Sequence, residues 1–166
     1  MADVKEKFGT ATAFTKTNAN LTNSATAGWM SNAIDNTANL YLDALVHAEL
    51  AAVNTAPANS KAIFLFAYAL VDSAASAYTS TGDATPSGSE GTLVFPDIAT
   101  LPIVLPLLGI VPYPVQNKAI NAGPFSVARC FGGILPPKWG IAMVNHSGMT
   151  LSVTNIKYIE VYNTVT

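Results

Sequence analysis

Charged side chains are scarce in this sequence. Asp, Glu, Lys and Arg make up 11% of the 166 residues, against about 25% in typical soluble domains. The formal net charge is only -2, so electrostatic repulsion gives a free monomer little protection against association. We therefore expect other copies of the chain, or partner proteins, to cover much of the surface. The alternative is a monomer that stays soluble through its Asn, Ser and Thr side chains.

Cysteine and histidine are nearly absent as well. Cys130 is the only cysteine, which excludes a disulfide within the chain. Its neighbour Arg129 could lower the pKa of the thiol, but a free cysteine is more often a small buried hydrophobe, and we predict that packing role. His47 and His146 are the only histidines and form no short-spaced ligand pair, so we expect no metal ion and no other cofactor.

Neither histidine needs a chemical role to explain its position. His47 shares a predicted strand face with Glu49, which favours a cross-strand polar contact. His146 lies between Asn145 and Ser147, where the sequence is typical of a tight turn. We interpret both as structural residues.

The chain also lacks a basic patch and a long apolar run. Its 8 basic residues are scattered and include a single arginine, so we expect no nucleic-acid partner. The strongest apolar runs, residues 62–71 and 101–111, are well short of the roughly 20 residues that span a bilayer. Residues 1–7 mix charges, and no signal-peptide apolar run follows them. We expect neither a membrane partner nor export through a signal.

Motifs of catalysis are missing too. The sequence has no Gly-x-Ser-x-Gly elbow and no glycine-rich phosphate loop between a strand and a helix. Asp35 and Asp43 are the only nearby carboxylates that could pair for acid–base chemistry. Asp35-Asn36-Thr37 is typical of an Asx-turn, however, and Asp43 faces outward from a predicted strand. Composition leaves open a Ser-His-Asp triad brought together by the fold, but we expect no enzymatic activity and no catalytic residues.

What the sequence does contain is a series of short segments with strand patterning. Residues 40–53 are rich in helix-favouring Leu, Ala and Glu, yet their pattern has period two and predicts a strand. One face carries Leu40, Leu42, Ala44, Val46, Ala48 and Leu50; the other carries Tyr41, Asp43, Leu45, His47 and Glu49. Residues 62–71 are aromatic and aliphatic throughout and predict a core strand.

Three more strands are predicted near the C-terminus, at residues 124–130, 140–145 and 152–163. Turns at Gly132-Gly133, at Pro136-Pro137 and at residues 145–148 separate them. The last strand alternates. We expect one face to carry Val153, Asn155, Lys157, Ile159 and Val161, and the other Thr154, Ile156, Tyr158, Glu160 and Tyr162.

The remaining segments are interpreted as loops and extended chain. A turn is predicted at residues 54–60, and residues 73–91, rich in Ser, Thr and Gly, predict a long surface loop. Prolines throughout residues 93–114 exclude a regular helix and place any strand at a sheet edge. Residues 9–27 suit an extended arm or edge strand that contacts another subunit, or else a loosely ordered tail.

About eight short strands separated by turns indicate an all-β protein. We predict an antiparallel β-sandwich, jelly-roll-like, with an extended N-terminal arm at residues 1–27 and a single sandwich domain at residues 28–166. Trp29 and Trp139 could be platforms on which a sugar stacks, but large aromatic side chains more often pack in a core or an interface.

Three stretches resemble a family of small structural proteins of tailed bacteriophages: residues 29–46, 61–68 and 124–148. The most specific element runs Phe131-Gly-Gly-Ile-Leu-Pro-Pro-Lys-Trp-Gly-Ile141. The resemblance implies a β-sandwich virion component without enzymatic activity, a decoration or cement protein on the capsid exterior, assembled in the host cytoplasm. Its implied partners are the major capsid protein and copies of itself, as a homotrimer or another homo-oligomer.

The sequence leaves a second function open. A receptor- or glycan-binding appendage of the phage head or tail would use Trp29, Tyr78 or the loop at residues 73–91.

Overall fold

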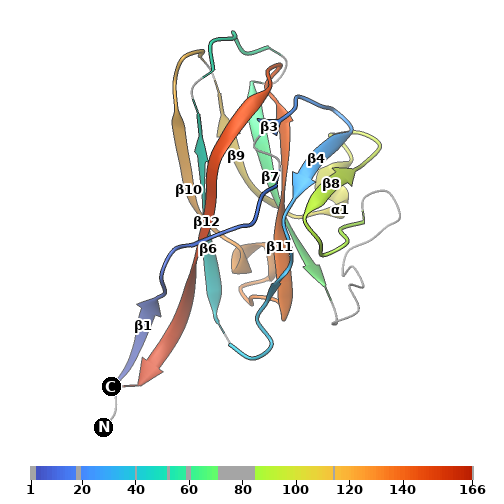
Figure 1. Ribbon diagram of the computed structural model, residues 1–166. Helices are drawn as coiled ribbons and strands as arrows, with labels where there is room; N and C mark the ends of the chain where they lie inside the picture. The colour runs from blue at the N-terminus through green and yellow to red at the C-terminus, as the bar shows by residue number, and fades with distance from the viewer. Residues whose placement is uncertain are drawn as a thin grey trace.

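The chain folds into an all-β sandwich of two antiparallel sheets (Figure 1). The computed structural model describes residues 3–17, 20–39, 41–51, 53–58, 61–70, 85–113 and 115–165. The first sheet has the order β1 (Val4–Phe8), β12 (Leu151–Val165), β6 (Asp43–Leu50), β10 (Ile120–Ser126), and β2 (Thr12–Ala13) and β3 (Asn20–Leu21) also pair with β12. The second has the order β8 (Gly91–Val94), β4 (Ala27–Met30), β11 (Lys138–His146), β7 (Ala62–Leu70), β9 (Leu107–Pro112), and β5 (Ile34–Asp35) also pairs with β11.

Strand β6 follows the predicted period of two. Ala44, Val46, Ala48 and Leu50 are buried, and the residues between them are half-buried. The strand begins at Asp43, so the exposed Leu42 precedes it, and Leu40 lies outside the described residues. A strand with one buried face keeps this alternation because a slip by one residue would turn its apolar set outward.

Strand β7 is buried along nearly its whole length, which confirms the predicted core strand at residues 62–71 up to Leu70; Val71 lies outside the described part of the chain. Ile63, Leu65 and Ala67 belong to the core between the two sheets. Phe66 and Tyr68 face the other way and belong to a second apolar cluster. A strand covered on both faces has a continuous apolar sequence rather than an alternating one.

The proline-rich segment supplies that second cover. Its residues Leu101, Val104 and Leu105 are buried against the outer face of the second sheet. Leu101–Val104 forms a one-turn helix, α1, so the expectation of no regular helix at residues 93–114 was wrong at this point. Pro102 occupies the first turn, where a missing backbone N–H costs no helical hydrogen bond. Strand β9, which ends at Pro112, lies at the edge of the sheet as predicted.

The predicted strand at residues 124–130 was wrong in its second half. The strand is β10, which begins earlier, at Ile120, and ends at Ser126. A 3-10 helix, η1 (Ala128–Phe131), follows and ends at Gly132, which has φ +75. The Asp43 carboxylate accepts a hydrogen bond from Ala128 N, at 2.8 Å, and so caps this turn from a distant strand.

The face assignment for the last strand was also wrong. Val153 is buried, but so are Ile156 and Tyr158, which the alternation placed on the opposite face. The register of β12 against β6 shifts between Val153 and Asn155. A β-bulge adds one residue to a strand and exchanges its faces, which no count of period two can anticipate.

The N-terminal residues pair with the sandwich. Strands β1, β2 and β3 all pair antiparallel with β12, and Phe14 and Leu21 are buried in the core. The predicted division into residues 1–27 and 28–166 stays a prediction.

Successive long strands alternate between the sheets, from β6 to β7 and from β10 through β11 to β12. That alternation is compatible with the predicted jelly-roll topology, which also stays a prediction. The predicted loop at residues 73–91 lies mostly outside the described residues, and its last residue begins β8.

Candidate functional site

The histidines have structural surroundings. His47 lies directly opposite Lys157 in β12, and it is Glu49 that forms the cross-strand ion pair, with 3.8 Å between its Oε1 and Lys157 Nζ. His146 is the last residue of β11, so its prediction as a turn residue was wrong: Asn145 and His146 still belong to the strand, and the chain turns after them, with Gly148 at φ +82. Within the described ranges, no three His, Cys, Asp or Glu side chains come together in a group that could hold a metal ion. None of the helices described there is long and apolar enough to cross a membrane.

Cys130 packs as a small apolar side chain in η1. It is half-buried against the main core, and its Sγ lies 3.7 Å from Leu107 O in β9. Burial raises the pKa of the Cys130 thiol, and the positive charge of Arg129 offsets this only in part. A thiol held in its protonated form is a poor nucleophile, so the position of Cys130 fits packing.

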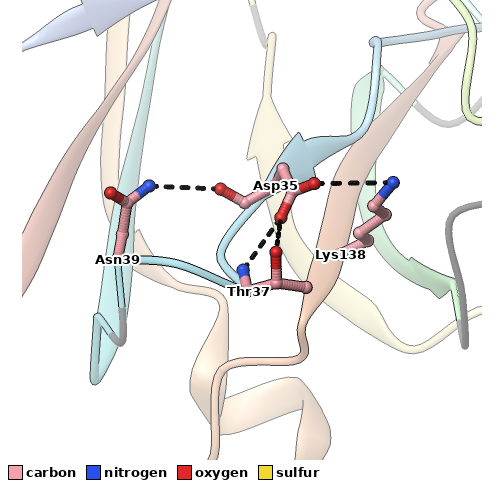
Figure 2. A network of polar contacts seen from close by, with 4 residues as sticks. All are labelled: Asp35, Thr37, Asn39 and Lys138. Atoms are coloured by element: carbon pink, nitrogen blue, oxygen red, sulfur yellow. Dashed lines mark hydrogen bonds and ion pairs between the residues drawn. The ribbon is translucent and has the colours of Figure 1, made fainter.

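The two aspartates considered for acid–base chemistry are engaged separately. Figure 2 shows the Asx-turn predicted at Asp35: its Oδ1 accepts hydrogen bonds from Thr37 N and Thr37 Oγ1, at 2.8 and 2.5 Å. Its Oδ2 lies 3.5 Å from Lys138 Nζ, and its backbone O accepts a bond from Asn39 Nδ2. The Thr37 hydroxyl lowers the pKa of Asp35, and Lys138 adds to the effect. Asp43 caps η1, so the two carboxylates serve different turns.

An open groove of about 450 Å³ lies between the N-terminal segment and strands β4 and β8. At one side the Glu90 carboxylate accepts hydrogen bonds from Trp29 Nε1 at 2.7 Å and from Thr17 Oγ1 at 2.6 Å. The Thr17 hydroxyl, followed by the Trp29 indole, lowers the pKa of Glu90. Glu90 therefore ties the N-terminal segment to β4.

Neither tryptophan presents an open ring. Trp29 is only 6% exposed and its indole N–H is used by Glu90. Trp139 is 1% exposed and packs edge-on against Phe14 and Tyr158, with ring centroids 6.0 and 5.4 Å apart. Packing, the role favoured from sequence, is what the structure shows for both. Tyr78 lies outside the described residues.

An exposed part of the fold is a two-stranded ribbon, which we define as β1 together with residues 161–165 of β12. Val4 pairs with Val165 and Phe8 with Val161. The ribbon extends away from the two sheets, beyond the ends of the other strands (Figure 1). All five residues of β1 are exposed, including Val4 at 65% and Phe8 at 56%, and Val165 is 71% exposed.

Aromatic contacts hold the ribbon at its base. Tyr162 lies near Tyr41, with ring centroids 5.8 Å apart, and Lys7 Nζ lies 5.8 Å from the centre of the Tyr162 ring. No core of its own covers either face of β1, since every residue in it is exposed. A two-stranded ribbon in water is marginally stable by itself, so a partner surface would stabilise it.

Sequence reasoning placed β1 within an arm and did not single it out. The signal was present, because Val4-Lys5-Glu6-Lys7-Phe8 alternates with period two. The contact of Trp29 with Glu90 was not visible, because these residues are 61 positions apart and Glu90 sits in a Ser- and Gly-rich loop.

Comparison with protein-family models, with curated proteins and with solved structures finds no match for this chain. The resemblance to tailed-phage structural proteins therefore stays a prediction from the sequence. A functional proposal therefore rests on the exposed surfaces and the composition of the chain itself.

Proposed function

We propose that this chain is a structural subunit of a bacteriophage virion and works by binding rather than by catalysis. In finer terms, we propose a decoration or cement protein on the capsid exterior that binds neighbouring copies of the major capsid protein. The observation that carries the proposal is the ribbon, because it places exposed apolar side chains on an element that the sandwich itself leaves uncovered.

The chemistry of the ribbon suits a protein contact. Val4, Phe8 and Val165 are large apolar side chains that are more than half exposed. Val4 and Val165 lie directly opposite each other, and exposed apolar surface gathered in one place on a soluble domain marks interaction sites. Binding would bury these side chains and stabilise a ribbon that is marginal alone.

The composition of the whole chain supports the same proposal. With 11% charged residues and a net charge of -2, association of copies meets little electrostatic resistance. We propose a homotrimer or another homo-oligomer, a jelly-roll topology and assembly in the host cytoplasm as finer parts of the same hypothesis.

Binding to particles provides the test. Phage particles that lack the protein would be mixed with the purified chain, sedimented, and examined by cryo-electron microscopy. The wild-type chain should sediment with the particles and appear on the capsid exterior, and Phe8→Asp should lose most of this binding. Ile103→Asp is the matched control, because Ile103 is also a large apolar residue, even more exposed than Phe8, but lies in α1, outside the ribbon. Density only in the tail, or full binding by Phe8→Asp, would contradict the proposal.

A second candidate function is a receptor- or glycan-binding appendage, favoured by the groove beside β4. Asn20, Asn23 and Thr92 are among its lining residues, and its volume of about 450 Å³ falls in the range of small-molecule sites. The buried ring of Trp29 weighs against this candidate, because sugar sites usually present an open aromatic face. A glycan array probed with the purified chain distinguishes the two, and saturable binding that Thr92→Trp abolishes would favour the appendage.

A further inference from the structure

Among the described residues, β12 is the only strand that pairs with β1, so no described strand lies along the outer edge of β1. Gly9 N donates a hydrogen bond to Glu160 O, and on the other side of β12 Leu42 N donates to Val161 O. Because backbone groups alternate between the two sides of a strand, Lys5 and Lys7 bond to β12. The N–H and C=O groups of Val4, Glu6 and Phe8 therefore point away from the sheet, toward the position of a further strand.

The side chains on this edge disfavour a second copy of β1 as that strand. Antiparallel pairing joins residues whose backbone groups both face the new partner, so the even-numbered residues must pair with one another. If Glu6 pairs with Glu6 of a second copy, Lys5 faces Lys7. A shift by two residues in either direction sets Lys5 opposite Lys5 or Lys7 opposite Lys7. Like charges directly opposite each other destabilise a strand pair, so the registers that set Lys5 opposite Lys7, or Lys7 opposite Lys7, are penalised. Where Lys5 faces Lys5, Lys7 faces Asp3 of the other copy, which offsets the repulsion.

Opposite charge would make the same edge attractive. Among the described residues, Lys5 and Lys7 take part in no ion pair, although Lys7 lies over the ring of Tyr162. A strand with carboxylates two positions apart would set one opposite each lysine. The residue between the two carboxylates would face Glu6, and the flanking residues would face Val4 and Phe8.

We propose that the free edge of β1 takes an extended acidic strand from a different protein, with the pattern apolar, acidic, basic or polar, acidic, apolar. The sequence argues that the strand is foreign, because no two of the chain's own Asp and Glu residues are two positions apart. Strand addition supplies backbone hydrogen bonds for affinity, and the alternate side chains supply specificity. The inference deepens the proposed function and rests on the ribbon as its contact surface.

Two synthetic peptides test the inference with the full chain. The first is Thr-Val-Glu-Lys-Glu-Val-Thr, and the second, Thr-Val-Lys-Glu-Lys-Val-Thr, exchanges the acidic and basic positions. Amide hydrogen exchange, read by NMR at millimolar peptide, should slow at Val4, Glu6 and Phe8 with the first peptide only. The amides of Lys5 and Lys7 are an internal control, because β12 already protects them.

The doubly substituted chain Lys5→Glu/Lys7→Glu is the matched variant. It should bind the acidic peptide about tenfold more weakly than the wild type does, and should prefer the basic peptide, since two cross-strand pairs change sign. Equal protection by both peptides, or none by the acidic one, overturns the inference. Protection that appears without peptide and rises with protein concentration also overturns it, in favour of a second copy.

Particle binding separates this inference from the proposed function. If Phe8→Asp loses particle binding while Lys5→Glu/Lys7→Glu keeps it, the ribbon remains the contact surface and the acidic strand is rejected. If both variants bind particles as the wild type does, the ribbon is not the contact surface and the proposed function loses its main support. That conclusion holds whatever the result of the peptide experiment.

Discussion

Single carboxylates fix loops and termini to the strands of this protein. Glu90 joins the N-terminal segment to β4 through Thr17 and Trp29, and Asp43 caps η1 from β6. Hydrogen bonds to an ionised acceptor are stronger than those between neutral groups. The few acidic residues of the chain thus have a large share in holding its irregular segments in place.

The Glu90 contacts predict a dependence of stability on pH. Hydrogen bonds from Thr17 and Trp29 lower the pKa of Glu90 below its usual value of 4.5. The stabilisation is therefore fully present above pH 4.5 and is lost as the pH falls through the lowered folded-state pKa. Glu90→Gln should lower the free energy of unfolding by about 1 kcal/mol at pH 7 and by clearly less at pH 3, as measured by urea denaturation.

Glu6→Gln is the control for that measurement, because Glu6 is an exposed carboxylate in the ribbon. The pKa of Asp35 is also lowered, so Asp35 contributes to the pH dependence of stability. Both variants keep Asp35, so its contribution cancels in the comparison. An equal loss from Glu90→Gln at both pH values would show that the charge of Glu90 plays no part.

Strands β7 and β11 depend on a glycine where their side chains cross. Gly140 pairs directly with Tyr68, and a Cβ at Gly140 would lie 2.3 Å from Cζ and 2.4 Å from the hydroxyl of that ring. The Tyr68 hydroxyl donates a 2.6 Å hydrogen bond to Ser31 O, and burial raises the pKa of Tyr68 to about 12. The ring is therefore fixed at both ends and has little room to move aside.

Gly140→Ala should lower the free energy of unfolding by about 2–3 kcal/mol, since overpacking a core forces side chains and backbone to shift. Gly91→Ala is the matched control, because a Cβ at Gly91 meets nothing within 4 Å and should change stability by less than about 0.5 kcal/mol. Thermal or urea unfolding of the two variants checks the difference. Similar stabilities would mean that Tyr68 can leave its site at little cost.

Among the secondary-structure elements, the sequence predicted those strands whose own hydropathy pattern shows which faces are buried. The alternation of β6 and the apolar run of β7 each follow from which faces are covered. The end of β10 and the start of η1 depend instead on Asp43, which is 85 residues away from Ala128. The bulge in β12 is likewise fixed by its register against β6. Contacts between distant residues leave no periodic trace in a local stretch of sequence.

The candidate site was predictable only in part, for the same reason. The pattern of residues 4–8 predicts a strand, but not that its partner is the last strand of the chain or that both leave the sandwich together. The buried state of Trp29 depends on Glu90, in a segment without periodicity. Packing of Cys130 and Trp139 was predictable because free cysteines and tryptophans usually pack in protein interiors.

On the scale of the whole molecule, one apolar core connects both sheets and the N-terminal segment. Phe14, Val46, Leu65 and Ile141 come from four different segments and belong to the same buried cluster. A shared core makes unfolding of one part costly to the others, so the described sandwich should unfold in one cooperative step.

Phe14→Ala tests this cooperativity. The substitution removes a ring that packs against Trp139 and Tyr158, and should lower the free energy of unfolding by about 3 kcal/mol. Tryptophan fluorescence and far-UV circular dichroism should still report a single, coincident transition. Phe8→Ala, in the exposed ribbon, should lower the free energy of unfolding by less than about 1 kcal/mol. Separate transitions for the two probes would show that the N-terminal segment unfolds on its own.

The pairing of the first strand with the last has a consequence for synthesis. A ribosome makes β1 before β12, and β1, β2 and β3 all pair with β12. The residues of β1 therefore leave the exit tunnel without their strand partner and wait until β12 has been made. Closing so long a loop is slow, and the newborn chain carries an open strand edge in the meantime. Several nascent chains lie close together on one messenger RNA. Repulsion between the lysines at positions 5 and 7 disfavours pairing between their β1 segments during this time.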